Sequence, residues 1–255
     1  MKLRVCIVSV TVLMSGCGTM ENPSLQSIEV PITGPHFRKD SDHLKSGQMD
    51  SGSSPEAPQD SPPYRQVLFE SSLSYADLSG AERRIDGVDN VIRIFDLSNV
   101  VPEQTINGYL SRLRRIMSAR PGSLELRRRQ ETLPDYPPRN AGHLVQAKVS
   151  YGDYDWGSGI FYLVQFTQGR GNYPNNSELG YLFQGLSKDG RFYVSADIRV
   201  AHPMLPLDSS EFPSVDSIDD AAMQMDLSLD GQKDSSFIPS LGEVRSLISG
   251  IKLGE

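Results

Sequence analysis

The stretch of sequence that decides the fold is residues 179–200, which read LGYLFQGLSKDGRFYVSADIRV. Apolar side chains recur at every second position on both sides of a Ser-Lys-Asp-Gly tetrapeptide, as expected for two strands that bury one face. The tetrapeptide is short enough for a tight turn, and Gly190 tolerates the positive φ that such turns require. The sequence therefore predicts an antiparallel hairpin here.

Further strands are predicted on the amino-terminal side of this hairpin. Residues 145–151 alternate between apolar and polar, whereas residues 160–166 are apolar at nearly every position, as in an interior strand. With the hairpin they predict an antiparallel meander of about four strands. Two shorter apolar runs, 66–69 and 90–97, also have the composition of strands.

Helical periodicity is found before and after the meander. Residues 103–119 and 217–229 carry apolar side chains at helical spacing, and residues 240–252 add a capping box between Ser240 and Glu243. Residues 123–142 hold three prolines and are predicted to be mostly loop. The expected fold class is α+β, an antiparallel sheet packed by helices, in a single globular domain over residues 64–255.

The amino terminus has the pattern of an export signal. Lys2 and Arg4 precede an apolar run over residues 5–14, which is too short for a hydrocarbon core of about 30 Å. The residues Leu-Met-Ser-Gly then lead to Cys17 and resemble a bacterial lipobox. Residues 1–16 are therefore expected to be a lipoprotein signal peptide, with Cys17 lipidated and attached to a membrane. The alternative is ordinary secretion with cleavage nearby.

Residues 17–63 are predicted to be the lipidated cysteine followed by a disordered linker. Gly, Pro and Ser account for 19 of residues 18–63, and the apolar residues show no regular period. Gly18 replaces the aspartate that retains lipoproteins at the inner membrane of enteric bacteria. The outer membrane is therefore the expected address in a bacterium with two membranes, with the domain in the periplasm or at the cell surface.

Charge excludes one class of partner and indicates another. The chain has 25 basic and 32 acidic residues, and loss of Lys2 and Arg4 leaves a net charge of −9. Generic binding of nucleic acid needs a basic surface and is not expected. Eight arginines nevertheless fall within residues 112–139. They suit an anionic envelope polymer or lipid head groups as partner, although a solvated helix face is the plainer interpretation.

Three side chains are weak candidates for ligand contacts. Arg170 lies in a Gly- and Asn-rich loop that could hold an anion, although a hairpin connection has the same composition. Trp156 could stack on a sugar or an apolar ligand, or pack at the end of a hairpin. His202 follows a strand and could act as a catalytic base, as could His143, or simply bond at the strand end. No metal site or cofactor motif is recognised.

Residues 156–166 (WGSGIFYLVQF), 176–196 (NSELGYLFQGLSKDGRFYVSA) and 202–206 (HPMLP) resemble a group of bacterial lipoproteins and secreted proteins. Those proteins carry a GSG-x-x-[FY]-L-x-Q stretch and the run Y-x-F-Q-G-L-[ST]-x-D-G-[KR]-[FY]-Y-V-[SA]-A. Trp156 departs from the usual Asn, and the connection at residues 127–129 is more basic than usual. The resemblance implies an envelope lipoprotein and supplies no catalytic residues.

The expected function is that of a membrane-anchored bacterial cell-envelope lipoprotein, acting as a non-enzymatic binding or structural module. A hydrolase with a His-containing site is one alternative. A carrier of an apolar or sugar ligand, built around Trp156, is the other. An envelope protein or an anionic polymer is the expected partner besides the membrane.

Overall fold

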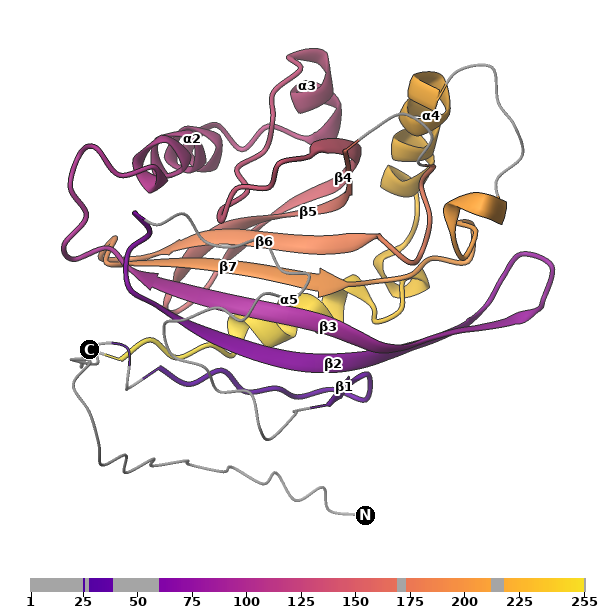
Figure 1. Cartoon of the computed structure of the whole chain (residues 1–255), viewed down its shortest axis with the longest axis horizontal. Helices are drawn as coiled ribbons and strands as arrows, with labels where there is room; N and C mark the ends of the chain where they lie inside the picture. The colour runs from indigo at the N-terminus through magenta and orange to yellow at the C-terminus, as the bar shows by residue number, and fades with distance from the viewer. Residues whose placement is uncertain (1–24, 26–27, 39–59, 169–172, 212–217, 255) are drawn as a thin grey trace.

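The computed structural model describes residues 25, 28–38, 60–168, 173–211 and 218–254. Its centre is a seven-stranded sheet with the strand order β1-β2-β3-β7-β6-β5-β4 (Figure 1), in which every neighbouring pair is antiparallel. The strands are β1 (Phe37–Arg38), β2 (Tyr64–Ala76), β3 (Glu82–Asp96), β4 (Gly142–Asp153), β5 (Gly157–Thr167), β6 (Gly180–Ser187) and β7 (Phe192–Arg199).

Helices cover both faces of this sheet. Helices α2 (Ile106–Ala119) and α3 (Ser123–Arg128) lie on one face, and α5 (Leu241–Ser249) lies on the other (Figure 1). Helix α4 (Ile218–Asp230) lies beside the edge strand β4. Two short 3-10 turns complete the described elements, at Ser209–Glu211 and Asp234–Ser236.

The strand periodicity sorts the apolar side chains into two cores. Along β5, Ile160 and Tyr162 pack under α2, while Phe161 and Leu163 pack toward α5. All four are fully buried, so β5 is apolar on both faces because both faces are covered. The predicted α+β class and the antiparallel meander are thus confirmed.

Two further predictions, the positive φ of Gly190 and the capping box at Ser240, are also confirmed, because each depends only on residues close together in the sequence. Gly190 has a φ of +73° in the turn between β6 and β7. At α5, Ser240 accepts the Glu243 backbone N–H while the Glu243 carboxylate accepts the Ser240 N–H, which is the predicted capping box.

Two elements differ from the sequence-based expectation. The 66–69 and 90–97 runs are parts of a much longer hairpin, β2–β3, whose outer half also buries one face. In β2, Leu73 and Tyr75 are buried and alternate with the exposed Ser74 and Ala76, an apolar signal of only two residues. Residues 123–128 form α3 instead of loop. Leu126 alone of that short helix is fully buried, which is too small a signal to show periodicity.

The expected linker of residues 17–63 is interrupted by a segment that packs on the domain. Ile28 is 3% exposed and Phe37 is 8% exposed, and both lie in the core beside α5. Phe37 pairs with Ser71 of β2, and Glu29 bridges to Lys252 near the carboxyl terminus. The folded domain therefore includes residues 28–38, well before residue 64.

The remaining predictions for the amino terminus fall on undescribed residues. The signal peptide at 1–16 and the lipidation site Cys17 lie outside the described residues, as do residues 18–24 and 39–59 of the linker. Among the helices that are described, none is both long and apolar enough to cross a membrane.

Candidate functional site

The arginines of α2 and α3 form a surface on one side of the molecule. Residues Ile106, Leu110, Leu113 and Ile116 bury one face of α2 against the sheet. The arginines between these positions consequently point away from the core. Residues 106–129 contain seven arginines and a single acid, Glu125. We call the outward-facing set the α2–α3 arginine surface: Arg112, Arg114, Arg115, Arg120, Arg128 and Arg129.

Half of this surface is paired with carboxylates. The three pairs each have a nitrogen–oxygen distance of 2.5 Å and join Arg115 to Glu131, Arg120 to Asp153, and Arg129 to Glu125. The arginine side chains remain 46–63% exposed, so these pairs contribute little to stability and can exchange for another anion.

The other half has no acidic partner within the described part of the chain. Arg114 and Arg128 are exposed, and Arg112 is half-buried against the helix. None of the three lies within ion-pair distance of a described carboxylate. In a protein of net negative charge, this is a local excess of positive charge that faces solvent.

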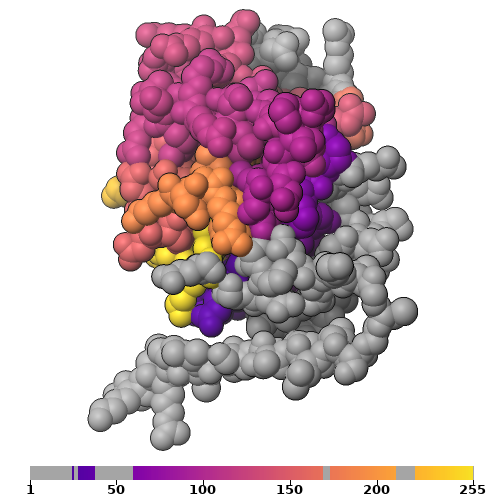
Figure 2. Space-filling view, turned by 90° about the vertical axis from the view of Figure 1, so that its left-hand side faces the viewer, coloured from indigo at the N-terminus to yellow at the C-terminus, as the bar shows by residue number. Residues whose placement is uncertain are grey.

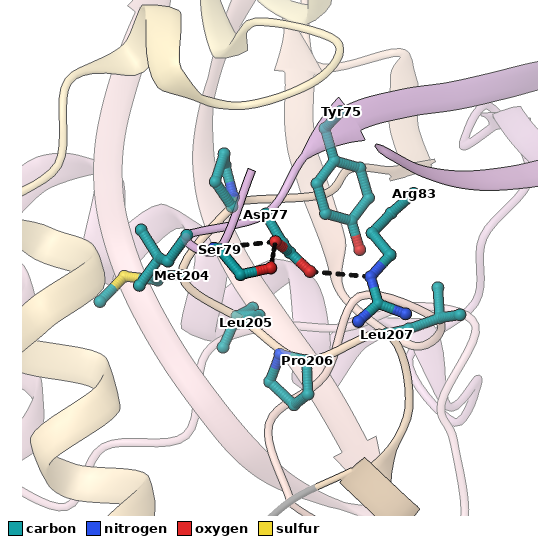
Figure 3. Close-up of a pocket in the computed structure, with 10 residues that line it drawn as sticks. Tyr75, Asp77, Ser79, Arg83, Met204, Leu205, Pro206 and Leu207 are labelled. Carbon is teal, nitrogen blue, oxygen red and sulfur yellow. Dashed lines mark hydrogen bonds and ion pairs between the residues drawn. The ribbon is translucent and has the colours of Figure 1, made fainter. Parts of the chain in front are cut away.

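A surface cavity of about 320 Å³ lies elsewhere, between the tip of the β2–β3 hairpin and the loop after β7 (Figure 3). Its lining combines Tyr75, Leu78 and Arg83 from the hairpin with Met204 and Pro206 from the loop. The Asp77 carboxylate beside them accepts from Ser79, from the Ala81 N–H and from Arg83. These bonds hold the pKa of Asp77 well below its usual range. The charged carboxylate therefore stabilises the hairpin turn through these hydrogen bonds.

A second cavity, of about 470 Å³, borders α3. It is lined by Arg127, Gln130, Glu131, His143 and Gln146 among others, and among the described residues that line it only Thr132 carries a hydroxyl. Burial lowers the pKa of His143, whose Nδ1 lies 3.4 Å from the Gln146 amide oxygen. Within the described residues, His143 contacts the Gln146 amide oxygen through Nδ1 and has neither a serine nor a carboxylate among its hydrogen-bond partners, so a catalytic triad is not supported here.

His202 is buried and bonded on both ring nitrogens. It is 4% exposed and packs against Phe237, with 4.6 Å between ring centroids. The Met204 backbone N–H donates to Nδ1 at 3.2 Å, and Nε2 lies 2.9 Å from the Ser236 hydroxyl oxygen. Burial, aided by the positive charge of Lys148, lowers the pKa of His202 to about 4.

This geometry opposes a catalytic His202–Ser236 pair. Because Nδ1 accepts a hydrogen bond, the proton of the neutral ring must sit on Nε2 and point at Ser236. The Ser236 hydroxyl in turn donates to the Lys233 carbonyl at 2.6 Å. A general base needs the reverse arrangement, with a lone pair at Nε2 and a carboxylate at Nδ1. His202 thus serves the structural role that the sequence left open.

Trp156 packs at the end of the β4–β5 hairpin. Its indole N–H donates to the Ile248 carbonyl at 3.1 Å, and its ring stacks on Tyr154 with 5.6 Å between centroids. Phe183 meets the indole edge-on at 5.9 Å. These contacts join the hairpin to α5 and favour the packing role over ligand stacking. Arg170 lies within residues 169–172, outside the described part of the chain.

Sequence reasoning missed a buried hub at Asn176, which it treated as hairpin loop. The Asn176 amide group donates to the Tyr75 hydroxyl and to the His202 and Leu205 carbonyls, and its oxygen accepts the His202 N–H. Asn176 thereby fixes the 202–206 loop that lines the cavity in Figure 3. No short-range pattern signals this role, because all three partners are distant in sequence.

A buried charge cluster lies on the α2 side of the sheet. Arg139 pairs with Asp197 and lies 3.7 Å from Asp135. Burial raises the pKa of Asp135 to about 7. Burial would also raise that of Asp197, but Arg139, with Arg199 and Arg93, outweighs it and holds the Asp197 pKa below its usual value. Neither cavity described above reaches this cluster.

Within the described residues, no three His, Cys, Asp or Glu side chains gather as a metal site. No protein-family model, curated protein or solved structure matches the chain. The α2–α3 arginine surface is therefore the candidate functional site that the geometry supports best.

Proposed function

We propose that the protein is a lipid-anchored component of the bacterial cell envelope, held by Cys17, that binds an anionic partner without catalysis. In a bacterium with two membranes, the expected membrane is the outer one. The observation that carries the binding part is the set Arg112, Arg114 and Arg128, which have no acidic partner among the described residues. The lipobox pattern before Cys17 carries the anchoring part.

The chemistry of the partner follows from the residue type. Guanidinium groups form planar, two-pronged hydrogen bonds with phosphate and carboxylate, which makes arginine the preferred residue for phosphate-bearing ligands. Three further arginines of the surface are held only by exposed ion pairs and can join such a contact. We therefore expect a polyanion with repeated phosphates, such as lipopolysaccharide or a wall teichoic acid.

The two alternatives have less support. A hydrolase would need His202 to offer a lone pair to a serine, and its ring nitrogen instead donates to one. A carrier built around Trp156 would need open space there, and Tyr154, Phe183 and the Ile248 carbonyl occupy its surroundings.

The binding test uses the mature chain with Cys17→Ser, titrated with purified lipopolysaccharide and with teichoic acid. Replacing Arg112, Arg114 and Arg128 together by Gln should weaken binding roughly 100-fold at low salt, since each charge near an anionic surface contributes about 1 kcal/mol. Added salt should shrink the difference.

The matched control removes three exposed cations from other places, as Arg84→Gln, Lys188→Gln and Lys233→Gln. It lowers the net charge equally and should leave most of the binding intact. If both triple variants lose binding to the same extent, the loss reflects net charge alone, and the proposed binding surface is wrong. For the anchor, radiolabelled palmitate should enter the native protein and fail to enter Cys17→Ser.

A further inference from the structure

The first feature is the short distance in sequence between the proposed anchor and the folded domain. Arg65 donates to the Leu25 carbonyl at 3.2 Å and to the Ile28 carbonyl at 2.8 Å. Only residues 18–24 separate Leu25 from Cys17. Fully extended, eight Cα–Cα steps reach at most about 28 Å. A free linker of 46 residues would instead average about 35–40 Å and extend much farther.

The second feature is how firmly the amino-terminal segment is attached. Glu29 and Lys252 exchange backbone hydrogen bonds of 3.0 and 2.9 Å, and the Lys252 ammonium group lies 3.0 Å from the Glu29 carboxylate. Ile28 and Phe37 are buried on either side of this bridge. These contacts place the point of attachment on the domain itself and not at residue 64.

The third feature is the side of the molecule at which this attachment lies. Residues 28–38 and the carboxyl-terminal segment lie on the α5 side of the sheet, while α2 and α3 lie on the opposite side (Figure 1). Figure 2 shows the same separation, with the magenta α2 region at the top and the yellow carboxyl-terminal region near the bottom. Two helices of about 10 Å diameter and a sheet separate the two outer surfaces.

The character of the α5 surface suits a position beside lipid head groups. Its exposed side chains include Ser246 and Ser249, which are small and uncharged. Its nearby charges include two ion pairs, Glu29 with Lys252 and Asp234 with Arg245, and the Glu243 carboxylate is hydrogen-bonded to the His36 ring. Among its described residues, this surface has neither the exposed large apolar side chains of a membrane-inserting helix nor an excess of acid that anionic lipids would repel.

We propose that the domain sits with its α5 side against the membrane that holds its own lipid anchor and presents the α2–α3 arginine surface away from that membrane. The proposal rests on the lipid anchor of the proposed function and adds a direction to it. The occupant of the α5 side is the bilayer head-group region. The anionic partner is then met in the space beyond the membrane, which favours a polymer such as wall teichoic acid over lipopolysaccharide of the anchoring membrane itself.

Energy transfer to the membrane tests this orientation, because the mature chain has no cysteine except Cys17. Ser246→Cys on α5 and Ser111→Cys on α2 are matched exposed positions for a donor dye. The acylated protein is bound from outside to vesicles of phosphatidylethanolamine and phosphatidylglycerol that carry a head-group acceptor. Transfer from position 246 should exceed transfer from position 111 several-fold.

A longer linker provides the control. Inserting about 35 Gly and Ser residues after Ser24 should lower the transfer from position 246 and make the two positions similar. If the acylated protein without the Gly/Ser insertion shows equal energy transfer from both positions, the proposed orientation is wrong. That result would not contradict the lipid anchor. Absence of acylation by mass spectrometry would overturn the anchor itself.

Discussion

The imidazole of His202 is held in one tautomer by a backbone donor, and this single hydrogen bond decides what the residue can do. The Met204 N–H occupies the nitrogen where a catalytic carboxylate would sit. The other nitrogen carries the ring proton and donates a hydrogen bond to the Ser236 hydroxyl oxygen. A serine within bonding distance of a histidine is therefore not sufficient to indicate a hydrolase.

The buried neutral ring predicts a pH-dependent stability. The pKa of His202 falls from 6.5 to about 4 on folding, so the unfolded chain binds a proton more readily than the folded one. This contribution is present above about pH 6.5 and is lost as pH falls toward 4, by at most roughly 3 kcal/mol. His202→Asn keeps an acceptor for Met204 and does not titrate.

Urea unfolding at about pH 7 and about pH 4.5 measures this effect. The stability difference between native protein and His202→Asn should shrink as the pH is lowered. A difference that stays constant with pH would show that the ring is protonated in the folded state.

At the scale of elements, the edge strand β4 is closed by the helix beside it. The Gln146 N–H donates to Asp226 at 2.9 Å and the Lys148 N–H donates to Asp230 at 2.5 Å. Arg127 pairs with both carboxylates and also donates to the Gln146 carbonyl. These side chains take the backbone groups that an open edge would offer to a second strand.

Asp226 makes this edge sensitive to pH in the opposite sense to His202. Burial raises the pKa of Asp226 from 3.8 to about 6, so the folded state holds the proton more tightly. Stability due to this group is greatest below about pH 4 and falls as pH rises through 6. Asp226→Asn should therefore be more stable than the native protein at about pH 7.5, with an advantage that fades toward about pH 4.5.

Thermal unfolding at the two pH values gives the comparison, and Asp230→Asn is the control. That variant keeps an acceptor for Lys148 but removes the closer partner of Arg127, so it should be less stable than the native protein at neutral pH. If Asp226→Asn is the less stable protein at both pH values, the ion pair outweighs burial and the prediction fails.

The elements that sequence could predict are those whose signal is local. The alternation over residues 179–200 and the Ser240–Glu243 box need only near neighbours, and both are present. The outer half of β2–β3 buries only Leu73 and Tyr75 as apolar side chains of β2, and α3 buries one leucine, so the apolar signal is one or two residues long in each. The arginine-rich stretch was visible in sequence, but which arginines are paired depends on distant acids such as Asp153.

At the scale of the whole molecule, the amino-terminal segment belongs to the core. Its apolar residues show no regular period in the sequence, because each makes a separate contact with α5 or β2. The residues that they contact lie more than 30 positions away along the chain. Phe37 meets Phe69 edge-on, with 5.5 Å between ring centroids. Composition alone suggested a linker, since Gly, Pro and Ser surround these few apolar side chains.

Truncating Phe37 tests whether the segment stabilises the fold. Phe37→Ala should lower the free energy of unfolding by about 3 kcal/mol or more, as for other buried aromatic residues. Leu78→Ala is the comparison, because Leu78 at the hairpin tip is 81% exposed and its loss should cost less than about 0.5 kcal/mol. If the two variants lose similar amounts of unfolding free energy in a urea titration, residues 28–38 do not stabilise the fold and belong to the linker.

The attachment of residues 28–38 also changes what a broken peptide bond would do. β1 precedes residues 39–59 and β2 follows them, and the two strands pair with each other. A protease that cut between Arg38 and Asp60 would leave two polypeptides still joined by strand pairing and by the buried Ile28 and Phe37. Under the proposed anchoring at Cys17, a cut between Cys17 and Leu25 would instead release the domain at once. Shedding from the cell would thus be governed by seven residues and not by the long polar stretch.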